Sequence, residues 1–187
     1  FVDELGEHES VDQNRLGDTL PLRRLLSPLP LAGDGQDQLI ETRHVTPSQI
    51  TRDLLTDARL TVVAGVRSIG EPADQLLRQY VEQGGQLIVA AGGDFDPQAW
   101  NAAAWRDGAG VLPLPLKAQL VGTAPTADRA DIPVFHLDPA TFDDPLLDLA
   151  LPKATSEQLL ASPFFFLAVG ADEQAPADAQ VERARLE

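Results

Sequence analysis

The sequence predicts an α/β protein built on a parallel sheet. Two apolar runs of strand length, Leu60 to Val66 and Leu87 to Ala91, flank an amphipathic helical segment, Glu71 to Gln83. Strand, helix and strand at this spacing are typical of a right-handed βαβ unit, whose two strands are parallel. Because both runs are continuous rather than alternating, we expect cover on both faces and therefore three layers.

The first 45 residues predict two shorter strands around a small helix. Residues 1–5 have the character of a strand, and the polar residues 6–17 that follow are typical of a loop. Asp18 is placed to cap a short leucine-rich helix that ends at Ser27 and Pro28. Residues 39–45 are rich enough in β-branched side chains to predict a second strand.

Two helix starts and one helix end carry clear local signals. Thr46, Pro47 and Gln49 stand at the N-cap, first and third positions of a capping box. Asp96 before Pro97 predicts another capped helix start. The helix at residues 71–83 is expected to turn an apolar stripe inward and to stop at a glycine pair. The stripe and the pair are Leu76, Leu77, Tyr80, Val81, Gly84 and Gly85.

The pattern becomes less regular after about residue 105. Glycines and prolines at residues 108–115 predict an ordered or extended loop. We expect short strands at residues 117–121, 133–137, 164–169 and 181–186, and short helices at residues 145–150 and 156–160. The 187 residues are enough for one sizeable core, so we expect a single domain over residues 1–187.

Composition excludes several functional classes. The chain has 14 Lys and Arg against 29 Asp and Glu, a formal net charge of −15. Such a surface repels phosphate backbones, so nucleic acid is not an expected partner. There is no cysteine, which excludes disulfides, thiolate metal sites and a cysteine nucleophile.

The sequence contains neither a spanning segment nor a signal peptide. No apolar run approaches the roughly 18 residues that a membrane helix needs. The chain opens on a strand-like segment without methionine and ends in an alternating one. We therefore expect a piece excised from a longer protein.

Residues 61–116 carry a resemblance to a known family. The stretches TVVAGVRSI, LLRQYVEQGGQLIVAAGGDFDPQAWN and GAGVLPLPLKAQL, with PLRRLLSPL before them and DDPLL after, carry it. The chain resembles the class I glutamine amidotransferase-like domain of membrane-anchored bacterial proteins of the BatA-like and von Willebrand A type. The resemblance implies a flavodoxin-like, doubly wound, mainly parallel sheet with ligands at the carboxyl ends of its strands.

The same resemblance implies that the catalytic nucleophile is missing. Active members of that family carry a cysteine on the elbow after the strand that is Leu87 to Ala91 here, so this position falls on Ala90 or Ala91. Neither side chain can attack a substrate. His136 and Asp138 form the only pair similar to the family's histidine and glutamate. Small residues at a strand end still allow the sharp turn that an elbow needs.

Four residues beyond this elbow are candidate ligand contacts. Gly92 and Gly93 stand next to a possible helix start and could cradle an anion, although no dinucleotide or P-loop motif is present. Asp94 and Asp96 could act as an acid and base pair or hold a hard cation. The structural interpretation favours a turn residue at Asp94 and a helix cap at Asp96.

These observations predict a non-catalytic binding or scaffolding domain. No cofactor and no metal are expected, and the expected partners are proteins or other domains of the same chain. The resemblance implies that membrane attachment comes from segments outside this sequence and that this domain lies outside the cytoplasm. The alternative is a hydrolase or lyase that uses Asp94, Asp96 or His136 as acid and base groups.

Overall fold

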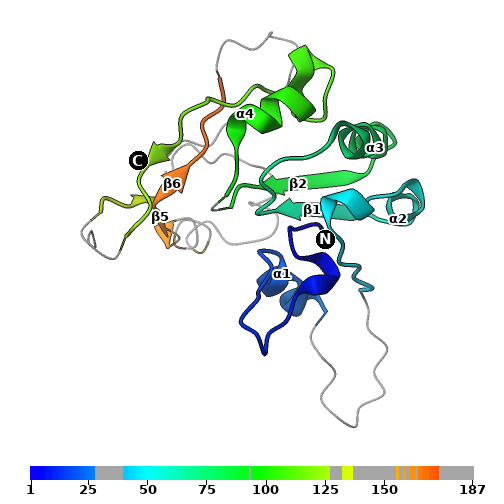
Figure 1. Ribbon diagram of the computed structural model, residues 1–187, viewed down its shortest axis with the longest axis horizontal. Helices are drawn as coiled ribbons and strands as arrows, with labels where there is room; N and C mark the ends of the chain where they lie inside the picture. The colour runs from blue at the N-terminus through cyan, green and yellow to red at the C-terminus, as the bar shows by residue number, and fades with distance from the viewer. Residues whose placement is uncertain are drawn as a thin grey trace. The chain divides into compact units, whose positions relative to one another are not determined.

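The computed structural model describes residues 1–27, 40–92, 94–126, 132–136, 155, 158, 161–162 and 164–172 (Figure 1). The chain divides into two compact units, Phe1–Pro115 and Leu116–Glu187. The first unit contains the parallel strands and the longest helix, and the second contains short antiparallel pairs. The protein is therefore of mixed helix and strand with a small parallel sheet.

The parallel pair that the sequence predicts forms the centre of the first unit. Strand β1 (Leu60–Ala64) and strand β2 (Gln86–Ala90) are parallel and lie side by side (Figure 1), with Thr61 opposite Leu87. Helix α3 (Glu71–Glu82) connects them. The predicted strand, helix and strand unit is confirmed.

Two further segments extend this sheet on the other side of β1. Val2 forms parallel bridges with both Val63 and Val45. The Val2 amide donates to the Val62 carbonyl at 2.8 Å, and the Val45 amide donates to the Phe1 carbonyl at 3.0 Å. The spatial order is therefore Val45, Val2, β1 and β2. In residues 40–45 only Val45 is bridged, so the strand predicted there is mostly wrong.

Burial differs between the two strands. In β1 the residues from Thr61 to Ala64 are all buried, as the apolar run predicts. In β2 exposed and half-buried residues alternate, and Ile88 is 50% exposed. Cover on both faces is confirmed for β1 and wrong for β2. The physical reason is that β2 pairs only with β1 among the described residues and stands at an edge.

Helix α3 packs against the sheet through a face centred on Leu77 and Tyr80. Ala73 and Asp74 extend this face toward the start of the helix, and both are buried. Val81, which the sequence places on the inward stripe, is 41% exposed, so that assignment is wrong. The helix ends as predicted, with Gly84 at φ 92° and the Gly85 amide bonded to the Tyr80 carbonyl at 2.9 Å.

Four short helical segments surround the amino-terminal half of the first unit. They are η1 (Gly6–His8), α1 (Leu20–Leu26), η2 (Pro47–Gln49) and α2 (Arg52–Thr56). The capping contact at Thr46 forms, since its amide donates to Gln49 Oε1 at 2.8 Å. It starts only one 3-10 turn, and α2 has its own cap at Thr51. Asp18 is not the cap of α1, because Thr19 occupies that position.

The segment after β2 is held by a cap and a buried tryptophan. Asp96 caps helix α4 (Pro97–Trp100), as predicted, by accepting from the amides of Gln98 and Ala99 at 3.0 and 3.1 Å. Trp100 is fully buried, stacks on Phe95 with 5.2 Å between ring centroids, and donates from Nε1 to the Val66 carbonyl. A π-helical turn, η3 (Asn101–Trp105), and a 3-10 turn, η4 (Arg106–Gly108), follow.

The glycine-rich and proline-rich segment that ends the first unit is an ordered loop, as predicted, and the structure shows that it packs on α3. Asp74 is fully buried, pairs with Arg106 and accepts from the Val111 amide at 2.9 Å. Leu112 and Leu114 are buried beyond it. Because a buried carboxylate needs such partners, Asp74 fixes the course of this loop.

The second unit contains two antiparallel pairs. Strand β3 (Val121–Gly122) pairs with β6 (Leu167–Ala168), and β4 (Phe135–His136) pairs with β5 (Phe164–Phe165). The single buried strand predicted at residues 164–169 is wrong, because it divides between two partners and Phe164 is 58% exposed. The elements predicted at residues 145–150 and 181–186 lie outside the described residues.

Within the ranges that the structure describes, no helix combines the length and apolar character needed to cross a bilayer.

Candidate functional site

The predicted site residues gather at the carboxyl ends of the parallel strands. Ala90 is the last residue of β2, Ala91 follows it, and both are exposed. Gly92 is half-buried, Asp94 is exposed, and Gly93 lies outside the described residues. This edge of a parallel sheet is where α/β proteins bind ligands.

The loops that follow β1 and β2 are in direct contact at this edge. The Gly65 amide donates to the Ala90 carbonyl at 3.1 Å, and the Asp96 amide donates to the Arg67 carbonyl at 3.0 Å. A Cβ on Gly92 would lie 2.5 Å from the Cα of Gly65. The two backbones are thus so close that only glycine fits at residue 92.

Asp18 lies against the same glycines. A Cβ on Gly65 would overlap the Asp18 carboxyl, and one on Gly92 would lie 3.3 Å from Asp18 Oδ2. Gly65 also has φ 65°, a conformation that favours glycine. Burial raises the pKa of Asp18, and repulsion from Asp3 and Asp94 raises it further. The Asp18 side chain therefore occupies the space above the turn after β1.

Asp3 is the most highly coordinated side chain of this edge. It is 1% exposed, and its Oδ1 accepts from the amides of Leu5 and Gly6 at 3.0 and 2.9 Å. Its Oδ2 accepts from the Thr19 hydroxyl at 2.6 Å. His44 Nε2 lies 2.8 Å from Oδ1, an ion-pair distance when the ring is protonated, although this nitrogen has no hydrogen bond of good geometry.

The pKa of Asp3 reflects two opposing effects. Burial by itself raises it, because a charged carboxylate loses solvation. Hydrogen bonds from Thr19 and Gly6 and the proximity of His44 act in the other direction, and the net result is a pKa below the ordinary value. Asp3 is therefore held ionised. It accepts hydrogen bonds from the loop at residues 5–6 and from Thr19 before α1, and it lies beside His44.

Further polar contacts connect Thr19 to Arg23 and Glu9. The Thr19 hydroxyl accepts from Arg23 Nε at 3.0 Å, and Arg23 forms an ion pair with Glu9. Glu9 in turn accepts from the Gly17 amide at 2.8 Å. Burial opposes ionisation of Glu9, but the bonds from Arg23 and Gly17 outweigh it and lower its pKa. The loop of residues 4–18 is thus tied to α1 and to the sheet.

The other predicted acid and base candidates lie on separate elements of the chain. Asp96 is engaged as the cap of α4. His136 lies on β4 of the second unit, whereas Asp94 and Asp96 belong to the first. Asp138 lies outside the described residues. In the part of the chain that the structure describes, no group of three or more His, Asp or Glu side chains could hold a metal ion.

Sequence reasoning missed both Asp3 and Asp18 as members of this edge. The available signal was an acidic residue directly after the Val2 strand segment, where a ligand site is expected in a parallel sheet. The partners of Asp3 stand 16 and 41 residues away, at Thr19 and His44, and no local pattern connects them.

Comparison with known protein families, curated proteins and solved structures finds no match for this chain.

Proposed function

We propose that the chain is a non-catalytic binding or scaffolding domain, related to class I glutamine amidotransferases, of a membrane-anchored bacterial protein. The proposed fold is three-layered and flavodoxin-like. The spatial order Val45, Val2, β1 and β2 supports it, since in chain order these are strands 2, 1, 3 and 4 of the flavodoxin-like arrangement. The membrane anchor would lie outside this sequence.

One observation carries the non-catalytic assignment: the place of a nucleophile is closed. Ala90 and Ala91 offer no reactive atom, and the Gly65 and Gly92 backbones meet beside them. The Asp18 carboxyl fills the adjacent space. A covalent mechanism needs a nucleophile, a base and room for the reacting carbon. This turn provides neither a nucleophile nor room for the reacting carbon.

The charge of this edge supports a protein partner or another domain of the same chain. Asp18 and Asp94 interact repulsively across it, so an anionic ligand would add to an existing excess of negative charge. Nucleic acid is disfavoured for the same reason. Ala90 and Ala91 are exposed at this edge and carry no charge, so they could contact a protein partner.

A hydrolase or lyase is the second candidate, and one observation favours it. Burial raises the pKa of Asp18, repulsion from Asp3 and Asp94 raises it further, and a carboxyl with a raised pKa beside a second carboxyl is typical of a general acid. Asp94, Asp96 and His136 remain the candidate catalytic groups of that alternative, with Asp18 added.

The experiment is a screen of glutaminase, esterase, phosphatase and glycosidase substrates with the wild type and two variants. Asp18→Asn with Asp94→Asn removes the carboxyl pair, and Asp96→Ser removes the third carboxylate but keeps a side chain that can cap α4. We expect no turnover above background from any of the three. Turnover that disappears in either variant would establish the enzyme.

The binding role is tested with a photo-crosslinking residue at Ala91 in bacterial membranes. We expect one protein to be captured from that position and not from Asp12, an exposed position in a turn distant in sequence. Capture at both positions, or at neither, would count against a binding surface at the carboxyl edge.

A further inference from the structure

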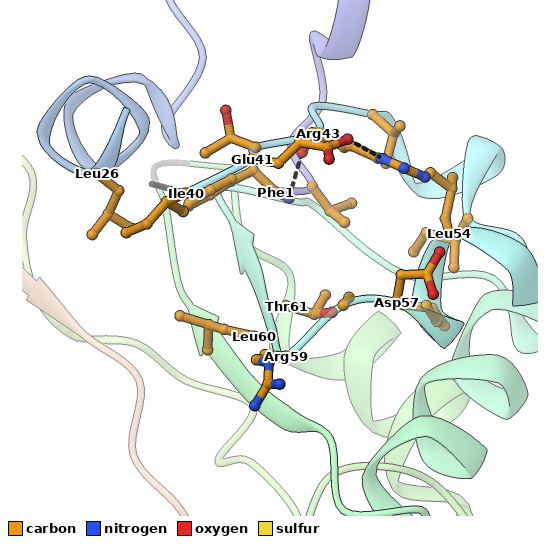
Figure 2. A pocket seen from close by; sticks show the side chains of 16 residues that line it. Phe1, Leu26, Ile40, Glu41, Arg43, Leu54, Asp57, Arg59, Leu60 and Thr61 are labelled. Carbon is orange, nitrogen blue, oxygen red and sulfur yellow. Dashed lines mark hydrogen bonds and ion pairs between the residues drawn. The ribbon is translucent and has the colours of Figure 1, made fainter. Parts of the chain in front are cut away.

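A cavity of about 410 Å³ lies at the opposite, amino ends of the same strands (Figure 2). Residues 40–43 line it on one side and residues 59–61 on the other, and Leu26 of α1 and Leu54 of α2 also contribute side chains. All of these residues belong to the first unit. The volume falls within the range of small-molecule sites, about 300 to 1,000 Å³. The cavity is therefore a second candidate site, separate from the carboxyl edge.

Most of the cavity surface is aliphatic. Ile50 and Leu55 are 7% and 9% exposed and form its buried floor. Ile40 and Leu60 stand at its walls and are 45% and 39% exposed. Large aliphatic side chains that are this exposed gain free energy when an apolar molecule covers them.

The charged side chains that line the cavity remain in contact with solvent. They are Glu41, Arg43, Asp57 and Arg59, and all four residues are exposed. Glu41 and Arg43 also form an ion pair with each other at 3.2 Å. A charged ligand would lose its own hydration inside the cavity without gaining a buried charged side chain as partner. The lining therefore favours a neutral ligand.

One buried polar side chain belongs to the lining, the threonine at position 61. Thr61 is 4% exposed, and among the described residues no hydrogen bond reaches its hydroxyl (Figure 2). A buried hydroxyl without a partner is unfavourable, and an oxygen atom of a ligand would complete its hydrogen bonding. A single polar contact in an otherwise apolar cavity is the usual means of fixing the orientation of a ligand.

We propose that this cavity binds a neutral, aliphatic small molecule with one hydrogen-bonding oxygen, such as a medium-chain alcohol or ketone. The aliphatic body lies against Ile50, Leu55 and Leu60, and the oxygen bonds to the Thr61 hydroxyl. This site is independent of the partner surface proposed at the carboxyl edge, so either can fail without the other.

The first test compares three probes of the same chain length on the full chain by isothermal titration calorimetry. Hexanol is the neutral probe, and hexylamine and hexanoate are the charged controls. We expect saturable one-to-one binding of hexanol and at least tenfold weaker binding of both charged probes at pH 7, because only these must be desolvated as ions. Absence of saturable hexanol binding, or equal or tighter binding of a charged probe, would overturn the proposal.

The second test removes the polar contact and then the space. Thr61→Val keeps the branched shape but lacks the hydroxyl, so it should weaken hexanol binding by about fivefold and leave binding of benzene, which has no oxygen, unchanged. Thr123→Val, at an exposed threonine of the second unit, is the matched control and should change neither. Ala58→Leu enlarges a half-buried side chain of the lining and should abolish binding of both probes at an unchanged or higher Tm.

Three results with these variants would contradict the site. They are an unchanged affinity for hexanol in Thr61→Val, a loss of the same size in Thr123→Val, and binding that persists in Ala58→Leu. Tm measured for each variant without a probe shows that the chain is folded, so a loss of binding is not a loss of structure.

Discussion

The two ends of the parallel strands are built in opposite ways. At the carboxyl ends, three loops close on one another through main-chain hydrogen bonds, glycine contacts and the buried Asp3 carboxylate. At the amino ends, the same strands border an apolar cavity of about 410 Å³ with exposed Leu60 and Ile40. The end where α/β proteins bind ligands is filled, and the other end is open.

This difference predicts which edge of the sheet is sensitive to single substitutions and which edge tolerates them. The carboxyl edge depends on a few polar contacts with narrow geometry, so single changes there should be severe. At the amino edge Ile40 and Leu60 are already partly exposed, so single changes of these side chains should be mild. Four predictions test this contrast, in order of decreasing effect.

The largest effect is expected for Asp3→Asn. The added amide N–H group would face the donors of Leu5, Gly6 and Thr19, so we expect the free energy of unfolding to fall by about 3 kcal/mol. Denaturant unfolding measures it, with Asp12→Asn in an exposed turn as the control that should change little. A loss as small as that of the control would remove Asp3 from its central role.

The same variant has a defined pH dependence. The pKa of Asp3 is lower in the folded chain than the ordinary value near 3.9, so its stabilisation is complete above that value. It is lost as the pH falls through the folded pKa. The difference in unfolding free energy between the wild type and Asp3→Asn should therefore shrink as the pH falls into the acid range. Above about pH 5 the titration of Asp3 should not change this difference further.

The second effect is expected for Gly65→Ala. The new Cβ would meet the Asp18 carboxyl and would also force alanine to φ 65°, so we expect a loss of about 2 kcal/mol or more. Gly84→Ala is the matched control, because Gly84 has φ 92° but no atom within 4 Å of a Cβ. It should lose only about 1 kcal/mol. Equal losses would mean that Asp18 does not fill the space above Gly65.

The third effect is that of Leu60→Ala at the exposed wall of the amino-terminal cavity, with the buried Leu55→Ala as its reference. Leu60→Ala should cost less than about 1 kcal/mol, because Leu60 is already 39% exposed. Leu55→Ala should cost about 2 to 3 kcal/mol, because Leu55 is 9% exposed and leaves a void. Thermal and denaturant unfolding of both variants check this. A severe effect of Leu60→Ala would show that the amino edge is as specific as the carboxyl edge.

The smallest effect is expected for Asp18→Asn, and it is a gain. The pKa of Asp18 is raised in the folded chain, so the folded state binds its proton more tightly and stability declines as the pH rises through that pKa. Asp18→Asn should raise Tm slightly at pH 7, by an amount that vanishes below about pH 4. A lower Tm at pH 7 would mean that the carboxylate makes a favourable contact at this edge.

Part of this architecture follows from local sequence alone. Residues close together in the sequence decide four features. These are the apolar run of β1, the amphipathic α3, the stop at Gly84 and the cap at Asp96. Periodicity and capping depend on neighbouring residues, and these four predictions are confirmed. The parallel pairing of β1 with β2 follows as well, since a short helical crossover permits little else.

The candidate site depended on tertiary structure. Thr19 and His44 stand 16 and 41 residues from Asp3 in the sequence. Asp18 reaches Gly65 and Gly92 only because the chain returns to the same sheet edge. Asp18 was predicted as a cap because local hydrogen bonding favours aspartate there, yet packing assigned it elsewhere. Neighbouring residues in the sequence determine which helices and strands form. The order of the strands decides which polar groups meet, because a buried polar group must bond with whatever lies next to it in space, however distant in sequence.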